Sequence, residues 1–188
     1  MTNPRVFRQL VAVAWAASIT VTMQSWVGRA TIYRPELTAR VEEAHEAILH
    51  NRVPDGRRWS TYGLNSTNIR VGAVFLAEGV RRVTGVSIPT AYRIVDTGAL
   101  LATLLLLLAF LGRLAPPPYA ILGATAFATM LPLTYQLFYF HPWDRLSLVG
   151  WIVLLMLLER GRFGLFAATL PVAMLMKFGV VLMRALFF

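Results

Sequence analysis

The sequence predicts an all-α protein, a polytopic integral membrane helical bundle with about five transmembrane helices. The first observation is composition, since 57% of the 188 residues are hydrophobic and 14% are charged, whereas soluble domains carry about 25% charged residues. The second is that the apolar residues fall in blocks close to the roughly 20 residues that cross a bilayer as a helix. The third is that later blocks are joined by stretches as short as "HPWDR" and "ERGR", which favours antiparallel neighbours.

The first apolar block runs from Leu10 to Gly28 and follows Arg5 and Arg8. It is longer than the apolar part of a signal peptide, and no small-residue cleavage site followed by a soluble domain is evident. We therefore expect residues 1–28 to form a retained anchor helix.

Residues 29–90 are the most polar part of the chain and are expected to form the first outer loop. In "RPELTARVEEAHEAILHN" apolar residues recur at helical spacing, which predicts an amphipathic helix. A second helix is predicted from about Ile69 to Val83. It is too short and too charged to span a bilayer, so we expect it to lie at the membrane interface or to pack on the bundle.

The rest of the chain, residues 91–188, is predicted to be a four-helix membrane bundle, so that the whole chain is a single membrane domain. The block Leu146–Leu158 is short, about 20 Å as a helix, whereas the hydrocarbon core of a bilayer is about 30 Å thick. This helix must therefore extend into its charged flanks or be shielded by neighbouring helices. The four apolar blocks are Ile88–Gly112, Tyr119–Phe140, Leu146–Leu158 and Phe163 to about Leu182.

Arginine placement predicts the orientation, because cytoplasmic loops are enriched in basic residues. We expect a multi-pass protein of the bacterial inner membrane with a cytoplasmic N-terminus and a periplasmic C-terminus. The arginines expected on the inside are Arg5, Arg8, Arg113, Arg160 and Arg162.

The formal charge is +9. Because the arginines flank apolar blocks, this charge predicts anionic lipids and not nucleic acid as partners. The chain has no cysteine, which excludes disulfides and thiolate chemistry. No metal is expected, since His45 and His50 are five residues apart, unlike the i, i+4 pair of a zinc-binding helix. No cofactor beyond bound lipids is expected, because those two histidines and His141 lie outside or at the ends of the spans, where axial ligation of a pigment or haem within the bilayer is unfavourable.

The stretch "YFHPWDRLSL" allows two interpretations. His141 and Asp144 could form a base or substrate-binding pair on the outer face. Alternatively, they belong to a turn in which Asp144 caps a helix that begins at Arg145. Interfacial or subunit contacts are expected for four aromatic residues, Trp26, Tyr139, Trp143 and Trp151.

Several charged residues are further site candidates. Arg93 and Asp96 are three residues apart, so they can pair on one helical face. A phosphate or lipid head group could bind Arg93, Lys177 or Arg184, although snorkelling explains such residues equally well. Three carboxylates could act as a base or hold a metal–phosphate ligand: Glu36, Glu42 and Glu43. Alternatively, they form a solvated face of the helix.

Two stretches carry a family resemblance. "AHEAILHNRVPDGRRW" resembles the segment after the first helix of C-type-fold membrane glycosyltransferases, and "FHPWDRLSLVGWIVLLMLLERGRF" followed by "ATLPVAMLMKFGVV" resembles a later stretch of the same enzymes. These enzymes move a sugar from a polyprenyl-phosphate donor at the outer membrane face. The resemblance implies an outer-loop acidic residue as the base, with Glu36, Glu42 and Glu43 as candidates, and contact between Lys177 and the donor phosphate.

The resemblance covers only the N-terminal half of such enzymes, which usually run to several hundred residues. We therefore expect a glycosyltransferase-like half-fold that serves as a non-catalytic accessory or scaffolding subunit of a larger membrane complex, with energy-converting photosynthetic or respiratory assemblies among the candidates. Its partners would be other membrane protein subunits. The alternative is a membrane glycosyltransferase, or a lipid-linked-sugar binding protein, that uses an outer-loop glutamate as base. A small transporter ranks third, because no inverted repeat is visible.

Overall fold

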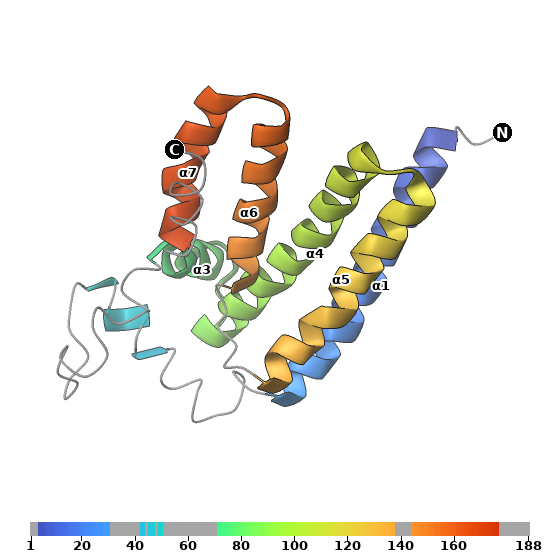
Figure 1. Ribbon diagram of the computed structural model, residues 1–188. Coiled ribbons are helices and arrows are strands. Elements are labelled where there is room, and N and C mark those ends of the chain that lie inside the picture. The colour runs from blue at the N-terminus through green and yellow to red at the C-terminus, as the bar shows by residue number, and fades with distance from the viewer. Residues whose placement is uncertain are drawn as a thin grey trace.

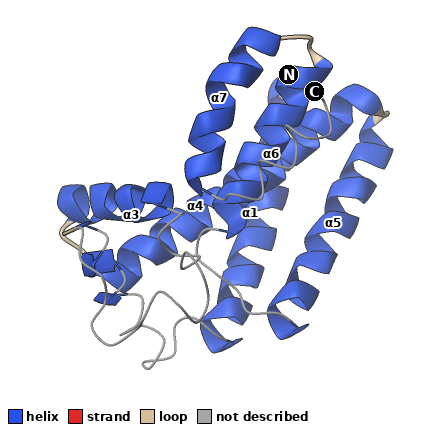
Figure 2. Cartoon of the chain, turned by 60° about the vertical axis from the view of Figure 1, so that its left-hand side comes forward, coloured by secondary structure: helices blue, strands red, loops and turns tan. Residues whose placement is uncertain are grey.

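A computed structural model describes residues 4–30, 42–43, 45–47, 49–50, 71–137 and 144–176. Within this part of the chain all regular structure is α-helical, which confirms the all-α part of the prediction (Figures 1 and 2). The helices with defined bounds are α1 (Pro4–Ala30), α3 (Val71–Thr84), α4 (Ile88–Leu114), α5 (Pro117–Leu137), α6 (Asp144–Glu159) and α7 (Phe163–Met176).

Two stretches of helix are long and apolar enough to cross a membrane, Val6–Ser25 in α1 and Ile88–Leu114 in α4. The segment Phe163–Met176 is also apolar but shorter. Helix α5 contains no charged residue in its 21 residues. Membrane-length apolar helices are therefore present where the sequence predicts the first two spans, while the total of five spans stays a prediction.

The helix α4 is central to the arrangement, since it packs against α1, α3, α5 and α6. Helices α1 and α5 lie together on one side of it, and α6 and α7 form a pair on the other (Figures 1 and 2). Helix α3 differs from the rest because it runs across the end of α7 instead of along the bundle (Figure 2). The helix predicted at residues 69–83 therefore packs on the bundle, which is one of the two placements that the sequence predicts.

Two sharp connections depend on glycine. Gly85, between α3 and α4, has a φ of 72°, and Gly161, between α6 and α7, has a φ of 63°. Residues with a Cβ rarely adopt these left-handed angles, so glycine permits the chain to reverse within a few residues. The third short connection is the proline-rich stretch at Pro116–Pro118, where α4 ends and α5 begins.

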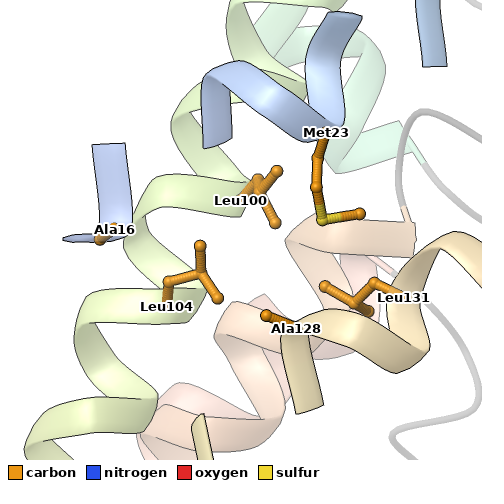
Figure 3. Packing of buried hydrophobic residues seen from close by; sticks show 6 residues of the cluster. All are labelled: Ala16, Met23, Leu100, Leu104, Ala128 and Leu131. Carbon is orange, nitrogen blue, oxygen red and sulfur yellow. The ribbon is translucent and has the colours of Figure 1, made fainter. Parts of the chain in front are cut away.

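The main apolar core lies between α1, α4 and α5 (Figure 3). Leu100 and Leu104 of α4 are fully buried, and small side chains at Ala16 and Ala128 allow the neighbouring helices to approach them. A second core joins α6 and α7 through Leu154, Phe166 and Ala173. Trp151, a candidate interface residue, is half-buried and packs against this second core.

Large apolar side chains also cover the outside of the molecule. On α1 Val21 is 70% exposed, and on α5 Leu122 is 66% exposed. Soluble monomers seldom expose large contiguous apolar patches. Other exposed side chains of this kind on α1, α5 and α7 are Phe7, Leu10, Val13, Tyr119, Ile121, Met130, Phe163, Leu165, Val172 and Leu175.

Candidate functional site: two buried polar clusters on α4

Polar side chains are buried along one face of α4, close to its first residue. Tyr92 and Asp96 are four residues apart, so they lie one turn apart on the same face, and they are 3% and 0% exposed. Each belongs to a separate group of polar residues. We call these the Asp96 cluster (Gln24, Asp96 and Arg145) and the Glu78 cluster (His45, Glu78, Arg81, Arg82 and Tyr92).

The Asp96 cluster joins three helices through one carboxylate oxygen. Nη1 of Arg145, on α6, donates to Oδ2 of Asp96, on α4, over 2.7 Å. Nε2 of Gln24, on α1, donates to the same oxygen over 2.8 Å. The Arg145 side chain is only 1% exposed, so a complete ion pair lies inside the bundle.

The position of Arg145 within α6 is unusual. It is the second residue of the helix, where the positive end of the helix dipole disfavours a cation. Its pairing with Asp96 offsets this cost. Asp144 precedes it as the first helical residue, where a negative charge is favourable, and the hydroxyl of Ser147 donates to the Asp144 carbonyl over 2.6 Å. The predicted cap at Asp144 is therefore within one residue of the observed start.

The ion pair of Asp96 is not the one that the sequence predicts. The spacing of three residues predicts Arg93 as the partner of Asp96. However, the Arg93 side chain is exposed, whereas Asp96 is buried and contacts Arg145 of α6.

The Glu78 cluster is centred on one carboxylate that accepts hydrogen bonds at both oxygens. Nε and Nη2 of Arg81 donate to it over 2.6 and 2.9 Å, and Nε of Arg82 donates over 2.6 Å. Spacings of three and four residues place all three side chains on adjacent turns of α3. Glu78 is 4% exposed, so it is a buried acid neutralised by two partly exposed arginines.

His45 links the short helical stretch around residues 42–49 to this cluster. Its Nε2 lies 3.3 Å from Oε2 of Glu78, and its Nδ1 lies 3.1 Å from the Tyr92 hydroxyl. A carboxylate can only accept, which assigns a ring hydrogen to Nε2, and in the neutral ring Nδ1 then accepts from the Tyr92 hydroxyl. The two rings also pack edge to face with centroids 5.6 Å apart. His45 is 1% exposed, and its two contacts fix this short helical stretch to both α3 and α4.

The arginines hold the pKa of Glu78 well below its usual range. The hydrogen bonds from Arg81 make the largest contribution and those from Arg82 the next, while burial acts in the opposite direction. In return, Glu78 raises the pKa of Arg81. A carboxylate held in this way does not accept a proton near neutral pH, so Glu78 serves as an ionic anchor instead of a general base.

This shift predicts a pH dependence of stability. Because the folded pKa of Glu78 is lowered, its ionic contribution is present above the unfolded pKa of 4.5 and is lost as pH falls towards the folded value. We expect the difference in melting temperature between the wild-type chain and Glu78→Gln to be constant from pH 8 to about 5.5 and to shrink below pH 4.5. Thermal melts across this range measure it. A difference that grows on acidification would contradict the assignment.

The other candidates from the sequence are placed as follows. Glu42 is half-buried and Glu43 exposed, both on the helical stretch that carries His45. His50 is exposed and contacts Glu46, at 3.4 Å. Among the residues that the structure describes, no three histidine, aspartate or glutamate side chains are grouped as metal ligands. Candidates outside the described residues, or with side chains outside them, are Glu36, His141, Tyr139, Trp143, Lys177, Arg184 and Trp26.

A further ion pair lies at the opposite end of the bundle. Nη2 of Arg113, at the end of α4, is 2.9 Å from Glu159, at the end of α6. Arg160 and Arg162 are exposed in the turn that follows. This end is also where α1 begins (Figure 1), so these arginines lie on the side of the molecule that the sequence predicts to be cytoplasmic.

Comparison with known proteins does not place the chain. It matches no protein family model, no curated protein and no solved structure.

Proposed function

We propose that this chain is a polytopic protein of the bacterial inner membrane that serves as a non-catalytic accessory or scaffolding subunit of a larger membrane complex. The observation that carries the proposal is the apolar outer surface of α1, α5 and α7. Such a surface is stable against lipid tails or the helices of another subunit and unstable against water.

Helix lengths support the membrane location. Helix α4 has 27 residues, or about 40 Å at 1.5 Å per residue, which exceeds a hydrocarbon core of about 30 Å. The mean hydropathy of its apolar stretch is 2.3. The length and hydropathy of α4, together with the apolar surfaces of α5 and α7, support about five spans. The basic end that carries Arg113 and Arg160 would then lie on the cytoplasmic side.

The state of the buried acids supports a scaffolding role. Asp96 is paired with Arg145, and Glu78 is held by Arg81 and Arg82. Each acid fixes elements that are distant in sequence, and neither is arranged to take a proton from a substrate. Polar groups within a membrane bundle that pair across helices also fix the helices in one arrangement, which suits a subunit that presents a rigid surface to partners.

A second candidate is a lipid-linked-sugar binding protein or transferase at the outer face. It is favoured by the position of the His45 stretch, whose Glu46 is close enough to raise the pKa of Arg81. Carboxylates at Glu42 and Glu43 would then lie on a stretch fixed beside two arginines. Transfer of a sugar from a phosphate-bearing donor requires a base close to a cation that binds the phosphate.

Gentle solubilisation of native membranes, affinity capture of the tagged chain and mass spectrometry of proteins and lipids separate the two proposals. The scaffold proposal expects a stoichiometric set of membrane subunits, with assembly unchanged by Glu42→Gln and Glu43→Gln. Capture of the chain alone with a polyprenyl-phosphate lipid, together with loss of sugar transfer in those variants, would replace it with the second candidate. Extraction of the chain by alkaline carbonate would contradict both.

A further inference from the structure

The outward face of α3 combines apolar side chains with an arginine. The inner face of this helix carries Ala73, Val74 and Ala77, which are buried. On the outer face Phe75 is 59% exposed and Val83 is 87% exposed. The Arg82 side chain, 74% exposed, lies on the same face because positions 75, 82 and 83 are each three or four residues from position 79.

If α4 spans a bilayer, the position of α3 places this face at the depth of lipid head groups. Only the three residues Gly85–Ser87 separate it from α4. If α4, about 40 Å long, spans a core of about 30 Å, its first turn lies beyond the hydrocarbon. Helix α3 runs across the bundle at that level (Figures 1 and 2). A close approach at Gly72 fixes it there, since an added Cβ would lie 2.9 Å from the Met176 sulfur on α7.

The charge on this face complements an anionic lipid. Arg82 uses its Nε to bind Oε1 of Glu78, which orients the guanidinium at the end of α3. Its two terminal nitrogens are not needed for this contact, and the side chain as a whole is largely exposed. A guanidinium group suits bidentate contact with a phosphate, and flanking apolar side chains are typical of helices that lie in the interface.

We propose that the outer face of α3 binds the bilayer surface, with Phe75 and Val83 among the head groups and Arg82 on the phosphate of an anionic phospholipid. Glu78 is then a positioning residue for Arg82. The inference rests on the proposed membrane location, so its test must separate failure of the α3 contact from failure of that location.

A nitroxide label measures the depth of α3 directly. The chain has no cysteine, so Gly79→Cys gives a single site on this face, and an added Cβ there meets no atom within 4 Å. A second labelled variant, Leu122→Cys on α5, reports the membrane location itself. In vesicles of phosphatidylcholine and phosphatidylglycerol we expect oxygen to relax both labels more strongly than a water-soluble nickel complex does, with the label at 122 deeper.

The two labels distinguish the outcomes. A label at 122 in the membrane and a label at 79 in water would overturn the α3 proposal alone. Both labels in water would overturn the membrane location as well.

Lipid selectivity is tested by titration of phosphatidylglycerol while the label at residue 79 is followed. We expect Arg82→Gln to raise the midpoint about fivefold, as for one arginine lost near an anionic surface. Arg82→Lys should retain part of the effect. Arg160→Gln, an exposed arginine at the other end of the bundle, is the matched control and should leave the midpoint at residue 79 unchanged. Equal shifts for Arg82→Gln and Arg160→Gln would mean general charge attraction and no site on α3.

Discussion

Replacing Arg145 with methionine is expected to lower the free energy of unfolding by about 3–5 kcal/mol, the usual cost of removing one partner from a buried ion pair. The substitution leaves the Asp96 carboxylate, which is fully buried, with the Gln24 amide but without its cation. Reversible unfolding of the full chain in mixed lipid–detergent micelles, followed by circular dichroism, measures the loss. The helix pairs α1–α4 and α4–α6 should loosen together because the cluster joins them.

The double variant Asp96→Leu with Arg145→Met is the control. Replacing both partners of a buried ion pair with apolar residues is often neutral or stabilising, so we expect it to recover most of the stability lost by Arg145→Met. A double variant as unstable as the single one would mean that the helices need the ion pair itself, and a single variant of normal stability would mean that Asp96 has another cation. Either result contradicts the role assigned here.

Elements with local signals are the ones that the sequence predicts well. The apolar block predicted over Ile88–Gly112 is observed as the helix Ile88–Leu114, and the helix predicted to begin near Ile69 begins at Val71. Each has an unbroken pattern of apolar residues and a glycine or proline at its boundary. The short apolar block at Leu146–Leu158 was expected to need its charged flanks or its neighbours, and α6 uses both, because it runs from Asp144 to Glu159 and buries Arg145 against α4.

The polar clusters could not be predicted in the same way. Gln24 and Asp96 are 72 positions apart, and Asp96 and Arg145 are 49 apart, so no helical periodicity connects them. A charged residue within an apolar block was a visible signal of a buried partner. The nearest opposite charge, Arg93, nevertheless faces outward, because a helix that buries one side must expose the other.

The same limit applies to the Glu78 cluster. Arg81 and Arg82 follow Glu78 at helical spacing, which a sequence can show. The third partner, His45, comes from a stretch 33 positions earlier, and in the sequence it stands in an acidic patch that favours solvent. Its burial follows from Tyr92 and Glu78, which offer a donor and an acceptor on opposite sides of one imidazole ring.

Replacing His45 with alanine is expected to release the stretch Glu42–His50 from α3 and α4. The substitution removes one partner from the Glu78 carboxylate and one from the buried Tyr92 hydroxyl. An unsatisfied buried polar group costs about 1–3 kcal/mol, so the local opening equilibrium should rise about 5- to 140-fold, at about tenfold for each 1.4 kcal/mol. Hydrogen exchange of backbone amides, resolved by mass spectrometry of the full chain in nanodiscs, measures this in the peptide that covers residues 42–50.

His50→Ala is the matched control, because that histidine is in the same stretch but its side chain is 56% exposed and contacts only Glu46 among the pairs described. It should leave exchange in this peptide within about twofold, the scale of a surface substitution within ±0.5 kcal/mol. Tyr92→Phe removes one hydroxyl and keeps the ring contact, so an intermediate increase is expected. If His45→Ala and His50→Ala accelerated exchange equally, the stretch would be held by its backbone and not by the imidazole. Faster exchange confined to His45→Ala and Tyr92→Phe would show that one buried ring joins the stretch at residues 42–50 to α3 and α4.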